Sequence, residues 1–264
     1  MTITQQRFHG YQQTSLLWQN ELEGIWQFHL DSDRLLSIDS KVDSKLRLGN
    51  YVERLFSYQL KQQKQIHVLK ENAQIIHHKT TLGEIDVLLI QNNQPIHIEI
   101  AYKFYIYDPN EGNTFLSRWI GPNRRDRLIQ KLAKIKQKQF PLLYSDACRS
   151  LLEELNLDTH QIQQKTYFKA QLFIPYASQI EFPLLNSNCI SGFYINKNQL
   201  SLFDNCKFYI PKKLDWLIIP YADVDWINFA TVQDRILEFL KKQSSPLLWI
   251  KYPNGEINKV FVIW

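Results

Sequence analysis

The sequence predicts an α/β protein, and three parts of the chain carry this prediction. Residues 81–107 are rich in β-branched and aromatic residues around a Gln-Asn-Asn-Gln-Pro turn, which is typical of two strands paired as a hairpin. Apolar residues recur at helical spacing before this hairpin, over residues 45–64, and after it, over residues 123–138. Strand-like runs separated by turns dominate residues 161–264. We therefore expect helices around a sheet, followed by a β-rich part.

The composition excludes several classes of protein. The chain has 264 residues, of which 44% are hydrophobic, so it can bury a substantial core. Its three cysteines are widely spaced and not in CxxC pairs, which argues against a disulfide framework or a zinc site. No stretch approaches the roughly 18 apolar residues of a membrane span, and the N-terminus lacks the apolar core of a signal peptide. We expect a soluble, cytoplasmic protein with no membrane partner.

Before the hairpin, the pattern changes from helix to strand. Apolar residues over residues 12–30 predict one or two short helices, broken at Gly24. The amphipathic helix of residues 45–64 carries Glu53 beside its apolar stripe. Two short β-like runs then lead into the hairpin, within residues 66–77.

After the hairpin, a basic helix is predicted over residues 123–138. Asn123 suits the N-cap, apolar residues recur at i, i+4 and i+7, and the helix should end before Pro141. With 31 basic against 26 acidic residues the net charge is +5, which favours polyanionic partners. Four side chains near the start of this helix are candidate contacts for nucleic-acid phosphates, with a solvated helix face as the alternative: Arg124, Arg125, Arg127 and Lys131.

The C-terminal part is predicted to be mainly β. A helix over residues 146–155 precedes it, and another lies within it at residues 232–242. The expected strands are residues 167–175, 188–195, 208–211, 215–220 and 260–264.

Ionisable residues stand where the hairpin should be apolar. Side chains along a strand alternate between its faces, so His97, Glu99 and Lys103 share one face of the second strand. Glu84 and Asp86 share one face of the first strand. Two carboxylates and an ammonium can therefore converge. Burying such charges without partners or a metal costs several kcal/mol each, so the cluster indicates a functional site.

The order of these features resembles the PD-(D/E)XK nuclease superfamily. A helix bears Glu53, one strand bears Asp86 within a GEID motif, the next bears Glu99 and Lys103, and a basic helix follows. The motifs are even more similar to those of a bacterial family, domain of unknown function 1853, which has GE-hydrophobic-D, E-x-A-x-K-F-Y and W-x-G-P-N-x-x-D-R-L. These motifs stand here at residues 83–86, 99–105 and 119–128.

The resemblance implies a fold, a chemistry and a role for each residue. The fold would be a restriction-endonuclease-like core, a central mixed sheet flanked by helices. Asp86 and Glu99 would be the metal-binding carboxylates, Lys103 the catalytic lysine and Glu53 an accessory acid. Carboxylates are hard oxygen ligands suited to Mg²⁺ or Mn²⁺, which implies metal-dependent hydrolysis of phosphodiester bonds in DNA or RNA. One position departs from the pattern, because Ala101 stands where the superfamily has its lysine.

On this basis the chain divides into three parts. They are an N-terminal helical segment, a nuclease-like core and a β-rich C-terminal part, over residues 1–44, 45–160 and 161–264.

Several alternatives stay open. One is a catalytically inactive nuclease-fold module that binds nucleic acid or a protein partner, and another is a metal-dependent hydrolase of a small phosphorylated substrate. A purely structural interpretation has Glu99 and Lys103 in a salt bridge, with Asp86 exposed at the end of its strand. His97 is either part of the site or a hydrogen-bonded structural residue. Glu84 is either part of the site or a solvated acid at the end of its strand.

Overall fold

The computed structural model describes residues 1–30, 36–39 and 41–264, which form two compact units. We call residues 16–102 and 130–169 the hairpin unit, and residues 1–15, 103–129 and 170–264 the C-terminal unit. Parallel and antiparallel strand pairs occur together with flanking helices, so the α/β prediction is confirmed. Each unit is assembled from separate segments of the chain, and the three-part division stays a prediction.

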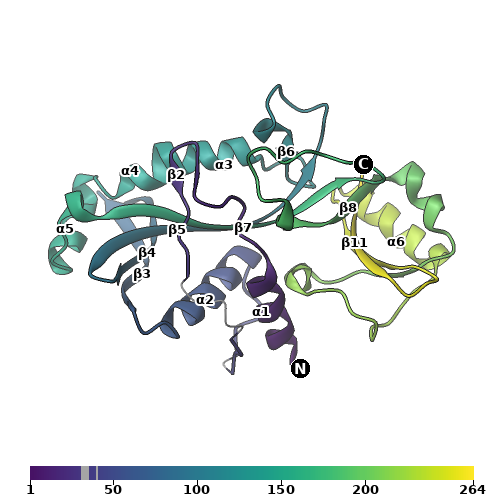
Figure 1. Ribbon diagram of the computed structural model, residues 1–264, viewed down its shortest axis with the longest axis horizontal. Coiled ribbons are helices and arrows are strands. Elements are labelled where there is room, and N and C mark those ends of the chain that lie inside the picture. Colours follow the sequence, from purple (N-terminus) through teal and green to yellow (C-terminus); the bar gives the residue numbers. More distant parts are fainter. Residues whose placement is uncertain (31–35, 40) are drawn as a thin grey trace. The chain divides into compact units, whose positions relative to one another are not determined.

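The hairpin unit is built on an antiparallel meander, with helices on both faces (Figure 1). The meander consists of β3 (Ile66–His77), β4 (Thr80–Gln91) and the first part of β5 (Gln94–Tyr107). The first part of β7 (Gln163–Pro175) is the neighbour of β5 in the sheet. Helix α2 (Leu48–Lys61) lies on one face. The helical segments on the other face are α3 (Leu128–Lys134), a π-helical turn (Ile135–Gln139), α4 (Phe140–Leu142) and α5 (Asp146–Glu154).

The predicted hairpin is confirmed, and its turn explains the register. Asn92 and Asn93 both have positive φ angles, 50° and 62°, as a two-residue hairpin turn of type I′ requires. Asparagine tolerates this left-handed conformation better than most residues. Apolar side chains of β3 and β4 then meet those of the α4 and α5 region in a buried cluster that includes Ile75, Leu88 and Leu152.

The C-terminal unit combines parallel and antiparallel strands in the order β7-β8-β11-β10-β9. Strands β7, β8 and β11 are parallel, whereas β10 is antiparallel to both of its neighbours. The bounds are β8 (Ile190–Asn196), β9 (Lys207–Tyr209), β10 (Leu247–Lys251) and β11 (Ile257–Ile263), with β6 (Trp119–Ile120) paired to β5, and helices α1 (Ile3–Gln13) and α6 (Phe229–Lys241).

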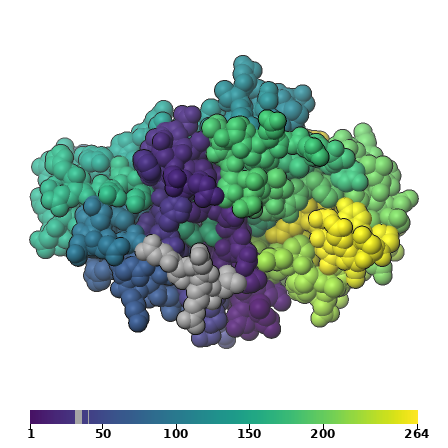
Figure 2. Space-filling view, viewed as in Figure 1, coloured from purple at the N-terminus to yellow at the C-terminus, as the bar shows by residue number. Residues whose placement is uncertain are grey.

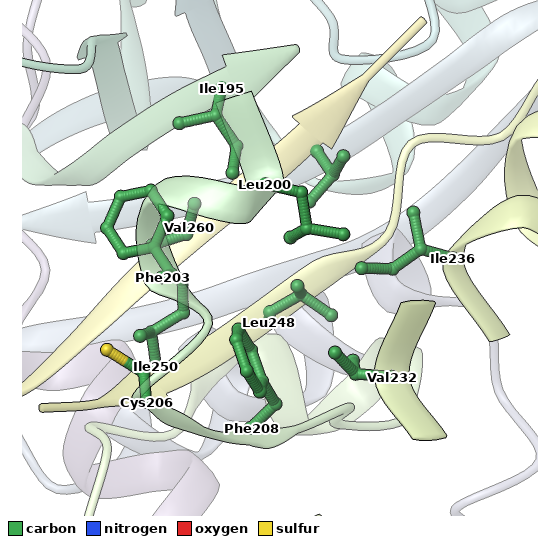
Figure 3. Packing of buried hydrophobic residues seen from close by; sticks show 11 residues of the cluster. Ile195, Leu200, Phe203, Cys206, Phe208, Val232, Ile236, Leu248, Ile250 and Val260 are labelled. Carbon is green, nitrogen blue, oxygen red and sulfur yellow. The ribbon is translucent and has the colours of Figure 1, made fainter. Parts of the chain in front are cut away.

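Helix α6 closes the core of this unit (Figure 3). Val232 and Ile236, which lie one turn apart on α6, point toward Leu248 of β10 and Val260 of β11. Full burial of each such side chain contributes about 1.5 to 3 kcal/mol.

Two expectations for the ends of the chain are wrong. The helices predicted over residues 12–30 are absent, because α1 ends at Gln13 and a two-stranded ribbon, β1 (Glu21–Leu22) and β2 (Ile25–Trp26), follows. Its turn residues Glu23 and Gly24 have φ angles of 54° and 78°, which no α-helix accommodates. Residues 215–220 contribute to a 3₁₀ helix (Lys213–Leu217) rather than a strand, because a short apolar run does not distinguish the two.

The basic helix also differs from its prediction at both ends. It begins at Leu128, and Asn123 instead accepts a hydrogen bond from the Ser245 backbone N–H at 2.8 Å. It continues through Pro141 into α4. A proline has no N–H and crowds the carbonyl of the preceding helical turn. The wider π-helical turn directly before Pro141 provides room for it.

Candidate functional site

The site lies in the hairpin unit, where strands β4 and β5 separate. Their ladder runs from Gln91 back to Val87 and stops there. Asp86 is the next residue, and its Oδ2 accepts a hydrogen bond from the backbone N–H of Ile100 at 2.8 Å. The Asp86 side chain thus takes the place of a backbone carbonyl as the acceptor for the Ile100 N–H. Glu99 is the residue that faces Asp86 when this register is continued, so the strand pairing brings these two carboxylates together. We call Asp86 and Glu99 the acid pair.

Both oxygens of Glu99 are held by hydrogen bonds from different elements. The residue is 1% exposed. His97 Nε2 lies 3.1 Å from Oε1, and the Gln139 amide donates to Oε2. On the other side of the ring, the Gln164 amide donates to His97 Nδ1 at 3.0 Å. Because Nδ1 accepts, Nε2 carries the proton and donates to Glu99.

His97 therefore acts as a neutral clamp on Glu99. Complete burial lowers the pKa of His97 to about 4. The ring stays uncharged at neutral pH and orients the carboxylate through a single donor. The interpretation of His97 as a hydrogen-bonded structural residue fits these contacts.

Lys131 reaches the acid pair through Gln139. Its ammonium donates to Gln139 Oε1 at 2.8 Å, which leaves the amide nitrogen of Gln139 for Glu99. An ammonium only donates and a carboxylate only accepts, so the two neighbours fix the orientation of the amide between them.

The π-helical turn makes this chain of contacts possible. Lys131 and Gln139 are eight residues apart, and eight residues of regular α-helix turn through about 800°, roughly 80° past two full turns. The π-helical turn is wider and takes up this excess, which brings the two side chains onto one face.

Burial raises the pKa values of both members of the acid pair. Burial, followed by the charge of Glu99, raises the pKa of Asp86 to about 7. Burial raises the pKa of Glu99 to about 7, although the ammonium groups of Lys131 and Lys134 act in the opposite direction. A bound cation would lower both pKa values, because a nearby positive charge favours the ionised form of a carboxyl group.

Two further carboxylates extend the cluster toward α2. The amide of Asn72 lies 3.2 Å from Glu53 Oε2 and 3.4 Å from Glu84 Oε1, and so bridges them. Asn72 adopts a left-handed conformation, with φ of 52°. Burial, then the charges of Asp86 and Glu84, raises the pKa of Glu53. Glu53 thus belongs to the same electrostatic cluster as the acid pair.

The other predicted site residues lie in the C-terminal unit. Lys103 donates to Asp126 Oδ2 at 2.6 Å. Arg124 forms ion pairs with Asp108 and Glu111, at 2.9 and 3.2 Å. In the same unit, Arg127 binds the carboxylate of Glu111 and Arg125 is exposed. The catalytic role of Lys103 and the nucleic-acid contacts of these arginines stay predictions.

The cluster offers two close oxygen donors rather than a complete metal cage. In the part of the chain that the structure describes, no group of three or more His, Cys, Asp or Glu side chains is arranged to hold a metal ion. Magnesium commonly binds through one or two carboxylates and retains several waters. The acid pair fits that mode, since it offers two carboxyl groups on facing strands.

Comparison with protein families gives a match that spans nearly the whole chain. A family model described as "Domain of unknown function (DUF1853)" matches residues 3–263. The chain belongs to this family. No curated protein and no solved structure matches it. As for membranes, none of the described helices of this DUF1853 protein is both long and apolar enough to cross one.

Two amide side chains that help to fix Glu99 have no signal of their own in the sequence. Gln139 and Gln164 lie 40 and 65 residues beyond Glu99 in the sequence, and amide side chains have no motif of their own. The sequence predicts Lys131 as a phosphate contact, and in the structure its ammonium donates to Gln139. The one available signal was the proline at residue 141 inside an apolar helical pattern, which often marks a local change of helix geometry.

Proposed function

We propose that this protein is a metal-dependent nuclease that hydrolyses phosphodiester bonds of DNA or RNA and has a PD-(D/E)XK-like fold. The observation that carries the proposal is the acid pair, the buried Glu99 and the mostly buried Asp86, on adjacent strands at the point where the ladder stops. Isolated buried carboxylates are costly, and proteins retain them where chemistry needs them. The order α2, then β3 to β5, then a helical segment also agrees with this superfamily.

Asp86 and Glu99 would hold Mg²⁺ or Mn²⁺ through oxygen atoms. A bound ion of this kind acidifies a coordinated water and stabilises negative charge on a phosphoryl oxygen. The chain's own residues do the positioning: the Ile100 N–H fixes Asp86, and His97 and Gln139 fix Glu99. Glu53 and Glu84, joined by Asn72, add negative charge at the side of the cluster.

Lys131 supplies positive charge near the acid pair. It lowers the pKa of both members of the acid pair. In a nuclease its ammonium would also attract the phosphate of a substrate, together with the exposed Lys134 and Lys138 of the same helical segment.

The test is cleavage of single- and double-stranded DNA and RNA with Mg²⁺ or Mn²⁺. Glu99→Gln should lower the rate by more than about 100-fold, because it removes a charge that acts at the reacting centre. Glu153→Gln, an exposed acid of α5 in the same unit, is the matched control and should cleave like the parent protein. Absence of cleavage by the parent protein over all metals and substrates would overturn the proposal.

A catalytically inactive nuclease-fold module is the second candidate. The ion pair of Lys103 with Asp126 favours it, because this lysine already has a carboxylate partner. Such a module would bind nucleic acid equally well in EDTA and as the Asp86→Ala variant, without cleavage. Binding that needs the metal and Asp86 would exclude it.

A further inference from the structure

Lys259, in the C-terminal unit, is a buried cation that the proposed nuclease chemistry does not use. It lies on β11, opposite Gly192 of β8 and Trp249 of β10. The C-terminal residues, yellow in Figure 2, form part of the surface, and the turn between β10 and β11 is exposed. Lys259 itself is only 5% exposed. Lysine is almost never buried to this extent unless it is paired.

The partners of Lys259 are neutral. Its Nζ donates to Gln171 Oε1 at 2.8 Å and to the Trp216 carbonyl at 2.7 Å. An ammonium has three donors, and the described ranges 1–30, 36–39 and 41–264 provide no partner for the third and no ion pair. The nearby buried carboxylate of Asp215 is bound by Arg7 at 2.7 Å. Among the described residues, Lys259 therefore has no counter-charge.

Burial disfavours the charged form of Lys259. Removal from water lowers the pKa of Lys259 to about 7. Holding the charged form in this place costs free energy, and a ligand of opposite charge would offset that cost.

Lys259 lines a cavity of about 240 Å³ that contains no acidic side chain. One part of the wall is polar and includes Gln13, Asn188 and Ser191, and another is apolar and includes Leu217, Ile219 and Pro220. The volume corresponds to roughly eight water molecules at about 30 Å³ each. This is a space for a small molecule with one polar and one hydrocarbon end.

The charges around the cavity favour anions with a single negative charge. The C-terminal end of α1 lines it, with Gly10 and Gln13, and the C-terminal end of a helix carries partial negative charge. Phosphate sites instead use helix N-termini or several cationic donors. One lysine beside a helix C-terminus suits a monoanion and disfavours a dianion.

We propose that this cavity binds a small monocarboxylate, with the carboxylate on the Lys259 ammonium and the hydrocarbon part against Leu217, Ile219 and Pro220. The third N–H of Lys259 then gains an acceptor and its charge gains a partner. The carboxylate belongs either to a free short-chain acid or to the C-terminal residue of a peptide.

Calorimetric titration of the intact protein with butyrate tests this site. Butyrate should bind at least about tenfold more tightly than butyramide, which has the same shape without the charge, because hydrogen bonds to charged groups contribute about 1.5 to 3 kcal/mol. Lys259→Met should abolish this preference. Lys251→Met, on neighbouring β10 and partly exposed, is the matched control and should retain it.

Further measurements distinguish a free acid from a peptide C-terminus and provide a test if the variant does not fold. Tighter binding of N-acetylvaline than of butyrate would identify a peptide C-terminus, and the reverse a free acid. If Lys259→Met does not fold, the Nζ resonance of Lys259 in the parent protein should shift with butyrate and not with butyramide. Equal binding of butyrate and butyramide by the parent protein, or no binding of either, would overturn the proposal.

Discussion

Replacing Asp86 with asparagine should stabilise the folded protein at about pH 8 and abolish metal-dependent cleavage. Asparagine keeps an oxygen that accepts the Ile100 N–H bond. It removes the carboxylate charge that burial and Glu99 make unfavourable. If the protein becomes more stable without the Asp86 carboxylate, the presence of that carboxylate is explained by function and not by stability.

The magnitude follows from the pKa of Asp86. That pKa is about 7 in the folded protein against an ordinary value of 3.8. The unfolded chain therefore releases this proton first as pH rises, so stability falls between about pH 4 and pH 7 and the full cost is present above pH 7. About 3 pH units at 1.36 kcal/mol each give about 4 kcal/mol as an order of magnitude.

Urea unfolding at about pH 4 and pH 8 provides the assay. Asp86→Asn should exceed the parent protein in unfolding free energy at the higher pH, and the difference should nearly vanish at the lower pH. Asp146→Asn, an exposed aspartate of α5, is the control and should change little at either pH. The same difference at both pH values, or a less stable variant at pH 8, would refute the electrostatic account.

Two other substitutions test the packing and the positioning contacts. Gln139→Leu removes the amide that holds Glu99 and should weaken Mn²⁺ binding about 10- to 100-fold in a calorimetric titration; unchanged affinity would show that Gln139 is dispensable. Gly10→Ala would place a Cβ 1.9 Å from the Leu217 carbonyl oxygen and should cost about 1 to 3 kcal/mol in urea unfolding. Gly49→Ala, whose Cβ would meet nothing within 4 Å, should not destabilise.

Local patterns predicted the elements whose residues interact mainly with their near neighbours. The alternation in β4 and β5 and the two asparagines between them were sufficient for the hairpin. Helix α2 and the helix at residues 146–154 follow from their apolar periodicity. The ribbon of β1 and β2 was missed, because its apolar residues are spaced like a helix although they pack separately.

The candidate site could be predicted only in part. Strand alternation placed Asp86 and Glu99 on facing strands, and the ladder that ends at Val87 agrees with this placement. The purely structural interpretation leaves Asp86 exposed at the end of its strand. This is wrong, because Asp86 is mostly buried. That interpretation also paired Lys103 with Glu99, whereas the partner of Lys103 is Asp126.

By itself, the sequence determined the two strands of the hairpin and which of their carboxylates share a face, because both depend on a period of two residues along one strand. Only the tertiary structure decided what surrounds those carboxylates. Gln139 and Lys131 act on Glu99 from a helical segment that contains a π-helical turn, and Gln164 of β7 contacts the ring of His97 beside Glu99. Burial by distant parts of the chain sets the pKa values of Asp86, Glu99 and Lys259. Desolvation depends on the packed neighbourhood, which no local pattern contains.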